Sequence, residues 1–333
     1  FHVTANNCAV QAGTLAGSRF VLMYKWDTLD ALKLIEAERV NTISAVPMMT
    51  RELLNHPEFS DYDTSSLASM GGGGAAMQPD LARKVDEQTK KARPAQGYGM
   101  TEVCGIITYI AGDVFLDRPE SCGYLAPTFE GRVIDAEGAV LASGEVGEVC
   151  VKGAAVIKGY LNRPEATAET IVDGWLHTGD LAEIGDDGYV KIIGRKKEII
   201  ITSGGKNIAP VELEDLIKPH PLVGQICMVG DGQKFLSALI VLDREGTSEK
   251  WASDNSVDYD IENFHNNPEV LKAIQSQIDK ANSKVANVQQ IKKFTILEEE
   301  WTDTSGELTP TLKLKRNVIN EVYKDKIDAM YKE

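Results

Sequence analysis

The stretch Leu67-Ala68-Ser69-Met70-Gly71-Gly72-Gly73-Gly74 decides the fold class of this chain. A few residues later, Pro79 stands where a helix can begin, because proline is favoured in the first helical turn. Leu81 and Val85 lie about one helical turn apart and would share the buried face of that helix. A short apolar segment, a glycine-rich connection and an amphipathic helix together indicate one strand–loop–helix unit of an α/β fold.

The residues before this stretch show the same alternation. Apolar spacing predicts a helix over residues 27–39, and a second, shorter helix is expected over 50–54. The apolar segment 42–46 between them is typical of a short strand. Strands that alternate with helices indicate a doubly wound parallel sheet, whose ligands bind beyond the carboxyl ends of the strands. The glycines at 71–74 would lie at such an end.

The pattern changes after about residue 120. Two pairs of apolar segments flank the turns Asp135-Ala136-Glu137-Gly138 and Asp186-Asp187-Gly188, which is typical of hairpins. These pairs are 132–134 with 145–152, and 181–184 with 189–193. We therefore expect a β-rich subdomain over about 120–194, after an α/β part that ends at about 119.

A compact α+β domain is expected beyond Gly194. The predicted elements are a strand at 199–202, a helix at 211–217, strands at 225–229 and 236–242, and an amphipathic helix at 268–281. The polar stretch 246–260 is interpreted as a surface connection between them.

Composition limits the class of protein. The 333 residues are enough for about two domains, and 43% hydrophobic with 26% charged residues is ordinary for a globular protein. A formal net charge of −15 argues against nucleic acid as the main partner, because phosphate backbones need basic clusters. Five scattered cysteines without a C-x-x-C spacing argue against disulfides and a cysteine metal site.

Location is predicted from the same features. No apolar run approaches the roughly 18 residues of a membrane-spanning helix, and no signal-peptide pattern opens the chain. We expect a cytoplasmic location, in which any membrane contact is peripheral. The chain begins with Phe1 rather than Met, so we also expect further sequence before it.

The most informative short segment is Gly97-Tyr98-Gly99-Met100-Thr101-Glu102. Glycine on each side of Tyr98 lets a flat ligand approach the backbone and stack on the ring. The Thr101 hydroxyl suits a phosphate oxygen, and the Glu102 carboxylate suits Mg²⁺. Taken alone, the segment is more typical of a glycine-rich turn that carries a surface glutamate.

Three further segments are weak signals individually. In Trp175-Leu176-His177-Thr178-Gly179-Asp180, the last carboxylate could accept hydrogen bonds from a ribose diol. Taken alone, Gly194-Arg195-Lys196-Lys197-Glu198 and the basic segment 308–316 are each more typical of solvated surface.

In this order, however, the segments resemble the signature of the adenylate-forming superfamily, which includes acyl-CoA synthetases, luciferases and peptide-synthetase adenylation domains. Phe1-His2 resembles the end of an earlier family motif, and the block from Gly159-Tyr160-Leu161-Asn162-Arg163 to Asp180 and Pro210 is highly specific. Thr309-Pro310-Thr311-Leu312-Lys313-Leu314-Lys315-Arg316 resembles the long-chain fatty acyl-CoA synthetases, because most other branches carry Gly before that first Lys.

The resemblance implies a ligase with two half-reactions. A carboxylate attacks the α-phosphorus of ATP and releases pyrophosphate, and coenzyme A then displaces AMP from the acyl-adenylate. Adenine would stack on Tyr98 beside a turn at 72–75, and ribose would be held by Asp180 and Arg195. The implied nucleotide-binding set is Gly72, Gly73, Gly74, Ala75, Tyr98, Gly99, Thr101, Asp180 and Arg195.

The resemblance also assigns the chemical steps. Lys313, Glu102 and Thr101 would be catalytic: Lys313 on the carboxylate and α-phosphate, Thr101 on the α-phosphate, and Glu102 on Mg²⁺. Gly204 and Gly205 would let pantetheine pass, and His2 would lie near the acyl pocket.

A domain arrangement follows from the same resemblance. Residues 1–194 would form the C-terminal part of the large AMP-binding domain, with a hinge at 195–197 centred on Lys197. Residues 198–333 would then form the small mobile domain.

One family feature is missing from this sequence. The Ser/Thr/Gly-rich loop that cradles the β- and γ-phosphates has no counterpart, so we expect a C-terminal fragment that is inactive in adenylation by itself. Two alternatives stay open: a ligase of aryl, short-chain or amino acids, and a non-catalytic nucleotide-binding domain.

Overall fold

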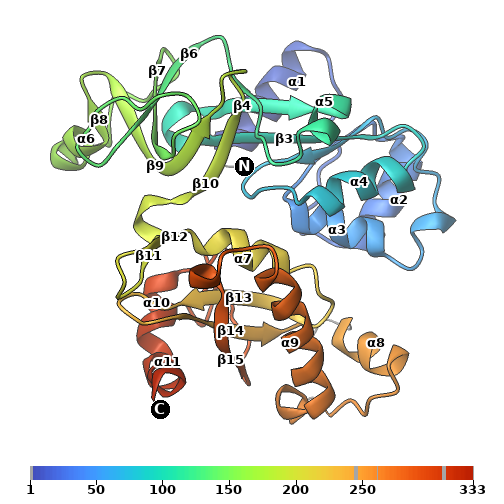
Figure 1. Ribbon diagram of the computed structural model, residues 1–333. Helices are drawn as coiled ribbons and strands as arrows, with labels where there is room; N and C mark the ends of the chain where they lie inside the picture. Colours follow the sequence, from blue (N-terminus) through green and yellow to red (C-terminus); the bar gives the residue numbers. More distant parts are fainter. Residues whose placement is uncertain (1–2, 244–246, 261, 310–312, 333) are drawn as a thin grey trace. The chain divides into compact units, whose positions relative to one another are not determined.

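The computed structural model describes residues 3–243, 247–260, 262–309 and 313–332 (Figure 1). The chain divides into two compact units, Phe1–Ile193 and Gly194–Glu333. His2 and residues 310–312, which the sequence analysis singled out, lie outside the described residues.

The first unit contains a five-stranded sheet of order β1-β2-β3-β4-β5. Its strands are β1 (Thr42–Ser44), β2 (Ser69–Gly72), β3 (Arg93–Met100), β4 (Gly105–Ala111) and β5 (Tyr124–Leu125). β1, β2 and β3 are parallel to one another. β4 pairs antiparallel with β3, and β5 pairs antiparallel with β4. The predicted α/β class is confirmed, with a mixed rather than wholly parallel sheet.

Three helices cover one face of this sheet and form its core (Figure 1). They are α2 (Thr28–Glu38), α3 (Pro47–Asn55) and α4 (Pro79–Gln88). The Asp27 side chain accepts the Asp30 N–H at 2.9 Å and so caps α2. α3 begins at Pro47 and not at residue 50 as predicted, because proline fits the first helical turn, where no intrahelical N–H bond is lost.

The remaining helical segments of this unit are short. They are η1 (Ala5–Gln11), α1 (Ala12–Leu15), η2 (Phe59–Asp61), η3 (Thr101–Val103), α5 (Gly112–Asp117) and α6 (Pro164–Thr170).

A second, antiparallel sheet has the order β10-β9-β7-β6, and β8 pairs with β9. The strands are β6 (Phe129–Ile134), β7 (Gly147–Gly153), β8 (Ile171–Val172), β9 (Trp175–Ile184) and β10 (Val190–Arg195). The predicted hairpins are present, but β9 is longer than expected. It starts at Trp175, so the Thr178-Gly179-Asp180 segment lies inside a strand.

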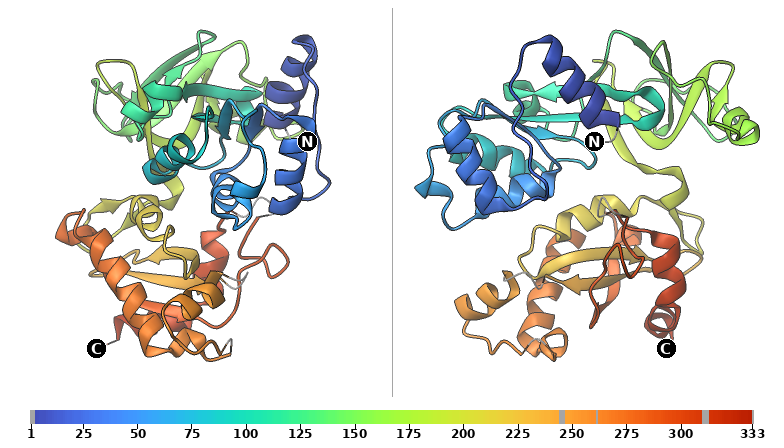
Figure 2. Two further views of the ribbon diagram at one scale, coloured as in Figure 1. Left: turned by 90° about the vertical axis from the view of Figure 1, so that its right-hand side faces the viewer. Right: turned by 180° about the vertical axis from the view of Figure 1, so that it is seen from behind.

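The second unit is built on a sheet of order β13-β14-β15, with helices on both faces (Figures 1 and 2). Its elements are η4 (Lys196–Glu198), β11 (Ile200–Ile201), β12 (Asn207–Ile208), α7 (Pro210–Ile217), β13 (Val223–Val229), β14 (Leu236–Leu242), α8 (Thr247–Asp254), η5 (Phe264–Asn266), α9 (Pro268–Asn282), η6 (Asn287–Gln289), β15 (Ile291–Leu297), α10 (Arg316–Val322) and α11 (Lys324–Tyr331).

Alternation along β13 separates two cores in this unit. Ile226 and Met228 pack with α7 and α9, whereas Cys227 and Val229 pack with residues of α10 and α11. Successive side chains of a strand point to opposite faces, so a strand covered on both sides is apolar throughout.

The interpretation of 246–260 as a surface connection is wrong in part. Residues Thr247–Asp254 form α8, in which Ala252 is fully buried and Trp251 packs against the main core of the unit. The many polar residues of this segment concealed the two apolar positions that attach the helix. Among the described residues, no helix is long and apolar enough to cross a membrane.

Candidate functional site

Tyr98 and Asp180 come together from different sheets of the first unit. The Tyr98 hydroxyl donates a hydrogen bond to Oδ2 of Asp180 at 2.6 Å. Burial, together with the negative charge of Asp180, raises the pKa of Tyr98 well above its ordinary value. The phenol is therefore neutral at physiological pH and acts as a hydrogen-bond donor.

The backbone around Asp180 is fixed by its neighbours on β7. The Thr178 hydroxyl donates to the Val149 carbonyl at 2.7 Å and accepts the Asp180 N–H at 3.1 Å. Gly179 between them adopts φ +72°, a left-handed conformation that favours glycine. The left-handed conformation of Gly179 thus produces a kink in the strand, and this kink sets the direction of the Asp180 side chain.

Glu148 supports the same kink and was missed by the sequence analysis. Glu148 is 6% exposed, and its carboxylate accepts the Gly179 N–H at 3.0 Å and lies 3.6 Å from Nδ1 of His177. The available signal was a glutamate directly before the apolar residues Val149, Cys150 and Val151, all of which are buried in the structure. Such a carboxylate needs hydrogen-bond donors, and the kink supplies one.

The glycine run lies beside the Tyr98 strand. β2 extends through Gly72, so the turn expected over residues 72–75 starts only after it. A Cβ on Gly72 would lie 2.2 Å from the Ala45 carbonyl oxygen, and one on Gly73 would lie 2.6 Å from the Gly97 carbonyl oxygen. These glycines are required because adjacent backbones pass too close for a side chain.

Gly74 and Ala75 continue from this strand end. Gly74 adopts φ +87°, and Ala75 is exposed. β2 ends at Gly72, which lies opposite Gln96 of the parallel strand β3, two residues before Tyr98. The structure therefore brings the glycine run close to the segment that carries Tyr98.

Glu102 lies in η3, directly after β3. Its Oε1 accepts a hydrogen bond from the Tyr160 hydroxyl at 2.8 Å, and its carbonyl accepts the Ile157 N–H at 2.8 Å. Burial and the bond to Glu102 raise the pKa of Tyr160. This links two sequence blocks that the motif analysis treated separately. Tyr160 was quoted there as part of a family block, but no role was assigned to it.

The residues next to Glu102 differ in their constraints. A Cβ on Gly99 would lie 1.9 Å from the Gly105 carbonyl oxygen, so only glycine fits there without a backbone shift. The Thr101 side chain is exposed. Directly after the end of β3, the chain therefore carries the Thr101 hydroxyl and then the Glu102 carboxylate.

The other predicted residues belong to the second unit. Arg195 ends β10, Lys197 is an exposed residue of η4, and Gly204 and Gly205 lie between β11 and β12. Gly205 adopts φ +73°, whereas a Cβ on Gly204 would meet nothing closer than 3.9 Å. Only Gly205 is thus required by its backbone conformation.

Lys313 is held in a hairpin by its pairing with Thr309. Its N–H donates to the Thr309 hydroxyl at 3.0 Å, and its carbonyl accepts the Thr309 N–H at 2.8 Å. Leu308 and Leu314 form the next bridge of this hairpin. The Lys313 side chain is exposed, so its ammonium group is available to a ligand.

These groups define what the first unit can bind. A neutral aromatic ring, a buried carboxylate and glycine-lined backbone at the ends of neighbouring strands suit a planar base attached to a polyol. The Glu102 carboxylate offers the hard oxygen ligands that Mg²⁺ prefers. Mg²⁺ usually keeps several waters and binds the phosphates of its substrate, so it needs few ligands from the protein. The donor type therefore fits the metal.

Family models match both units. The AMP-binding enzyme model matches residues 1–161, and the AMP-binding enzyme C-terminal domain model matches residues 197–333. The chain belongs to the AMP-binding, adenylate-forming enzyme family. This confirms the resemblance inferred from the motifs.

Curated relatives of this family include two kinds of CoA ligase. A long-chain-fatty-acid–CoA ligase of Mycobacterium bovis is 41% identical over 239 residues, which cover 71% of this chain and 38% of the relative. A 4-coumarate-CoA ligase of Narcissus pseudonarcissus is 36% identical over 234 residues, covering 69% of this chain and 43% of the relative. The chain thus spans about two fifths of the length of these relatives.

Solved adenylate-forming enzymes share the fold. O-succinylbenzoate coenzyme A synthetase of Bacillus subtilis, solved with ATP and magnesium ion, matches with a TM-score of 0.73 and 26% identity. The match covers 95% of this chain and 58% of that structure.

Proposed function

We propose that the protein is an ATP-dependent acid–thiol ligase that converts a long-chain fatty acid, ATP and coenzyme A to acyl-CoA, AMP and pyrophosphate. The observation that carries the proposal is the Tyr98–Asp180 contact, which joins a flat ring to a diol acceptor. The 41% identity to a long-chain-fatty-acid–CoA ligase supports the reaction class.

In this proposal, the first unit binds the AMP portion of the nucleotide. Adenine stacks on Tyr98 next to the glycine run, and Asp180 accepts hydrogen bonds from the ribose. An ionised carboxylate has about four acceptor sites, so Asp180 can accept from Tyr98 and from ribose hydroxyls together. Arg195 is the proposed second ribose contact.

Thr101 and Glu102 are the proposed phosphate residues. The Thr101 hydroxyl donates to an α-phosphate oxygen, and Glu102, oriented by Tyr160, is the protein ligand for Mg²⁺. When bound, Mg²⁺ neutralises charge on the phosphates of ATP.

Lys313 is the proposed cation for adenylation. Its ammonium group binds the substrate carboxylate and the α-phosphate, where negative charge gathers as the carboxylate attacks phosphorus and pyrophosphate leaves. The proposed hinge is at residues 195–197, centred on Lys197. Between the half-reactions, the small domain from residue 198 onward would rotate about this hinge. Gly204 and Gly205 would then border the path of the CoA thiol.

The choice of acid rests on one sequence feature. Residues 309–316 carry Leu312 rather than Gly before Lys313, as in long-chain synthetases. The alternative is an aryl acid, favoured by the 36% identity to a 4-coumarate-CoA ligase.

A substrate panel tests the proposal. Protein expressed from its complete open reading frame is assayed for pyrophosphate release with acetate, octanoate, palmitate and 4-coumarate. Each buried methylene contributes roughly 0.8 kcal/mol, so four of them should raise kcat/KM by about two orders of magnitude. A higher kcat/KM for 4-coumarate or acetate would contradict the long-chain assignment.

A further inference from the structure

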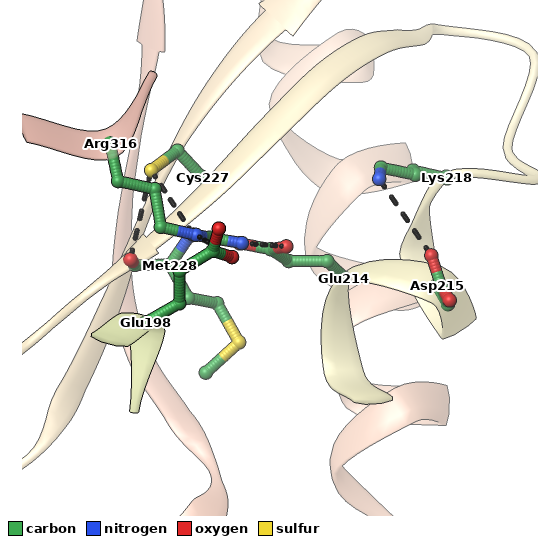
Figure 3. Close-up of polar contacts among 7 residues, drawn as sticks. All are labelled: Glu198, Glu214, Asp215, Lys218, Cys227, Met228 and Arg316. Atoms are coloured by element: carbon green, nitrogen blue, oxygen red, sulfur yellow. Dashed lines mark hydrogen bonds and ion pairs between the residues drawn. The ribbon is translucent and has the colours of Figure 1, made fainter. Parts of the chain in front are cut away.

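Arg316 joins two carboxylates in the second unit (Figure 3). Its Nη1 and Nη2 donate to Oε1 and Oε2 of Glu214 at 2.8 and 2.6 Å, which is a two-pronged ion pair. Its Nε donates to Oε2 of Glu198 at 3.1 Å. One guanidinium therefore ties together α10, α7 and η4.

The Glu214 side of this cluster is anchored in the core. Glu214 is 1% exposed, and its Oε1 also accepts the Met228 N–H of β13 at 2.7 Å. Nη1 of Arg316 additionally contacts Sγ of the buried Cys227 at 3.5 Å. Arg316 thus has a fixed position relative to the sheet of this unit.

The chain connects Arg316 directly to Lys313. Only two residues separate them, and the Lys315 N–H donates to the Glu307 carbonyl at 2.7 Å. With the Leu308–Leu314 bridge, this bond holds the segment in a hairpin up to the start of α10. A shift of the Arg316 side chain would therefore move the base of the hairpin that carries Lys313.

The other carboxylate connects Arg316 to the proposed hinge. Glu198 directly follows Lys197, and it lies 118 residues from Arg316 in the sequence. Burial lowers the pKa of Arg316, but the charges of Glu214 and Glu198 outweigh it and raise this pKa, so the guanidinium stays charged.

We propose that Arg316 is a positioning residue for Lys313: it fixes the Lys313 hairpin to the core through Glu214 and to the residue after the hinge through Glu198. When the chain rotates at Lys197, the Lys313 segment then moves together with the residues after the hinge. This inference rests on the proposed ligase function, because it concerns the placement of Lys313 during adenylation.

Three variants test it in protein expressed from the complete reading frame. Arg316→Lys keeps the charge but loses the fork and the Nε donor. Glu198→Gln weakens only the hinge-side contact and leaves the buried Arg316–Glu214 pair intact, so it serves if Arg316→Lys fails to fold. Lys218→Gln is the matched control, since Lys218 pairs with Asp215 on α7 at 3.7 Å, apart from this cluster (Figure 3).

Misplacing a catalytic group by about 1 Å costs on the order of 10²-fold in rate. We therefore expect single-turnover adenylation to fall about 10- to 100-fold in Arg316→Lys and Glu198→Gln at saturating ATP and acid. The KM values, and thioester formation from added acyl-adenylate, should stay close to wild type. Lys218→Gln should match wild type in every measurement.

Combination with Lys313→Ala separates positioning from general destabilisation. If Arg316 acts through Lys313, adding Arg316→Lys or Glu198→Gln to Lys313→Ala should cause no further loss of adenylation. Additive losses, or equal losses in both half-reactions that follow the melting temperature, would overturn the inference while the ligase function stands. A wild-type protein that releases no pyrophosphate with any acid would overturn both.

Discussion

The Tyr98 hydroxyl and the Asp180 carboxylate, 82 residues apart in the chain, meet at 2.6 Å and connect the two sheets of the first unit. The contact joins β3 to β9 at the segments that the motif analysis selected for adenine and ribose. One hydrogen bond thus has a structural role and a proposed binding role, and substitutions can separate them.

Tyr98→Phe should destabilise the protein while keeping the ring. A hydrogen bond to a charged group contributes about 1.5–3 kcal/mol, so the free energy of unfolding should fall by about that amount. Nucleotide stacking should largely survive in Tyr98→Phe and be lost in Tyr98→Ala. Urea denaturation and AMP calorimetry measure the two effects, and unchanged stability of Tyr98→Phe would count against the contact.

The same contact predicts a pH dependence. Because the pKa of Tyr98 is raised above its unfolded value of roughly 10, the folded protein keeps a proton there that the unfolded chain loses. Its contribution is complete below about pH 10 and is lost as the pH rises toward the folded pKa, at up to about 1.4 kcal/mol per pH unit. Between about pH 9 and 11, the free energy of unfolding should therefore decrease less steeply with pH in Tyr98→Phe than in wild type. Identical slopes would refute this.

Glu148→Ala should relax the kink that carries Asp180. It leaves the Gly179 N–H without its acceptor, which costs roughly 1–3 kcal/mol of stability, and AMP binding should weaken as Asp180 shifts. Glu130→Ala is the matched control, because Glu130 is exposed on β6 of the same sheet. Its effect should stay within about 0.5 kcal/mol. Equal effects of the two substitutions would mean that Glu148 does not hold the kink.

The sequence predicted local features better than partners across the fold. Helices with apolar faces and proline starts, such as α4, and hairpins around Asp-Gly turns follow from local rules. The Tyr160–Glu102 and Glu148–Gly179 contacts depend on strand order and register, which local patterning does not contain. α8 was missed because its attachment uses few apolar residues in a polar segment.

Family likeness supplied roles that residue chemistry alone left undecided. Arg195, Lys197 and Lys313 are exposed basic residues, and their local sequence taken alone is more typical of solvated surface. Glu214 shows the converse case: it is a fully buried carboxylate on an otherwise ordinary amphipathic helix, and its Arg316 partner lies 102 residues away.

Gly204→Ala tests the proposed path of the thiol. Its backbone conformation accepts a side chain, and the nearest atom to an added Cβ is Oγ1 of Thr202 at 3.9 Å. Stability should therefore change by less than about 0.5 kcal/mol. Adenylation should be unaffected, whereas transfer from acyl-adenylate to coenzyme A should slow. If transfer from added acyl-adenylate proceeds at the wild-type rate, the methyl group does not border the path.

Lys313→Ala should abolish most adenylation without destabilising the fold. The Lys313 side chain is exposed, and its hairpin is held by backbone bonds that alanine preserves. Loss of a fixed cation at developing negative charge costs on the order of 10²–10³ in rate. Thioester formation from added acyl-adenylate should be retained, because that step needs no cation between carboxylate and α-phosphate. Lys315→Ala in the same hairpin controls for loss of a nearby charge and should keep most of both activities. Equal loss of both half-reactions in Lys313→Ala would show that Lys313 does not act specifically in adenylation.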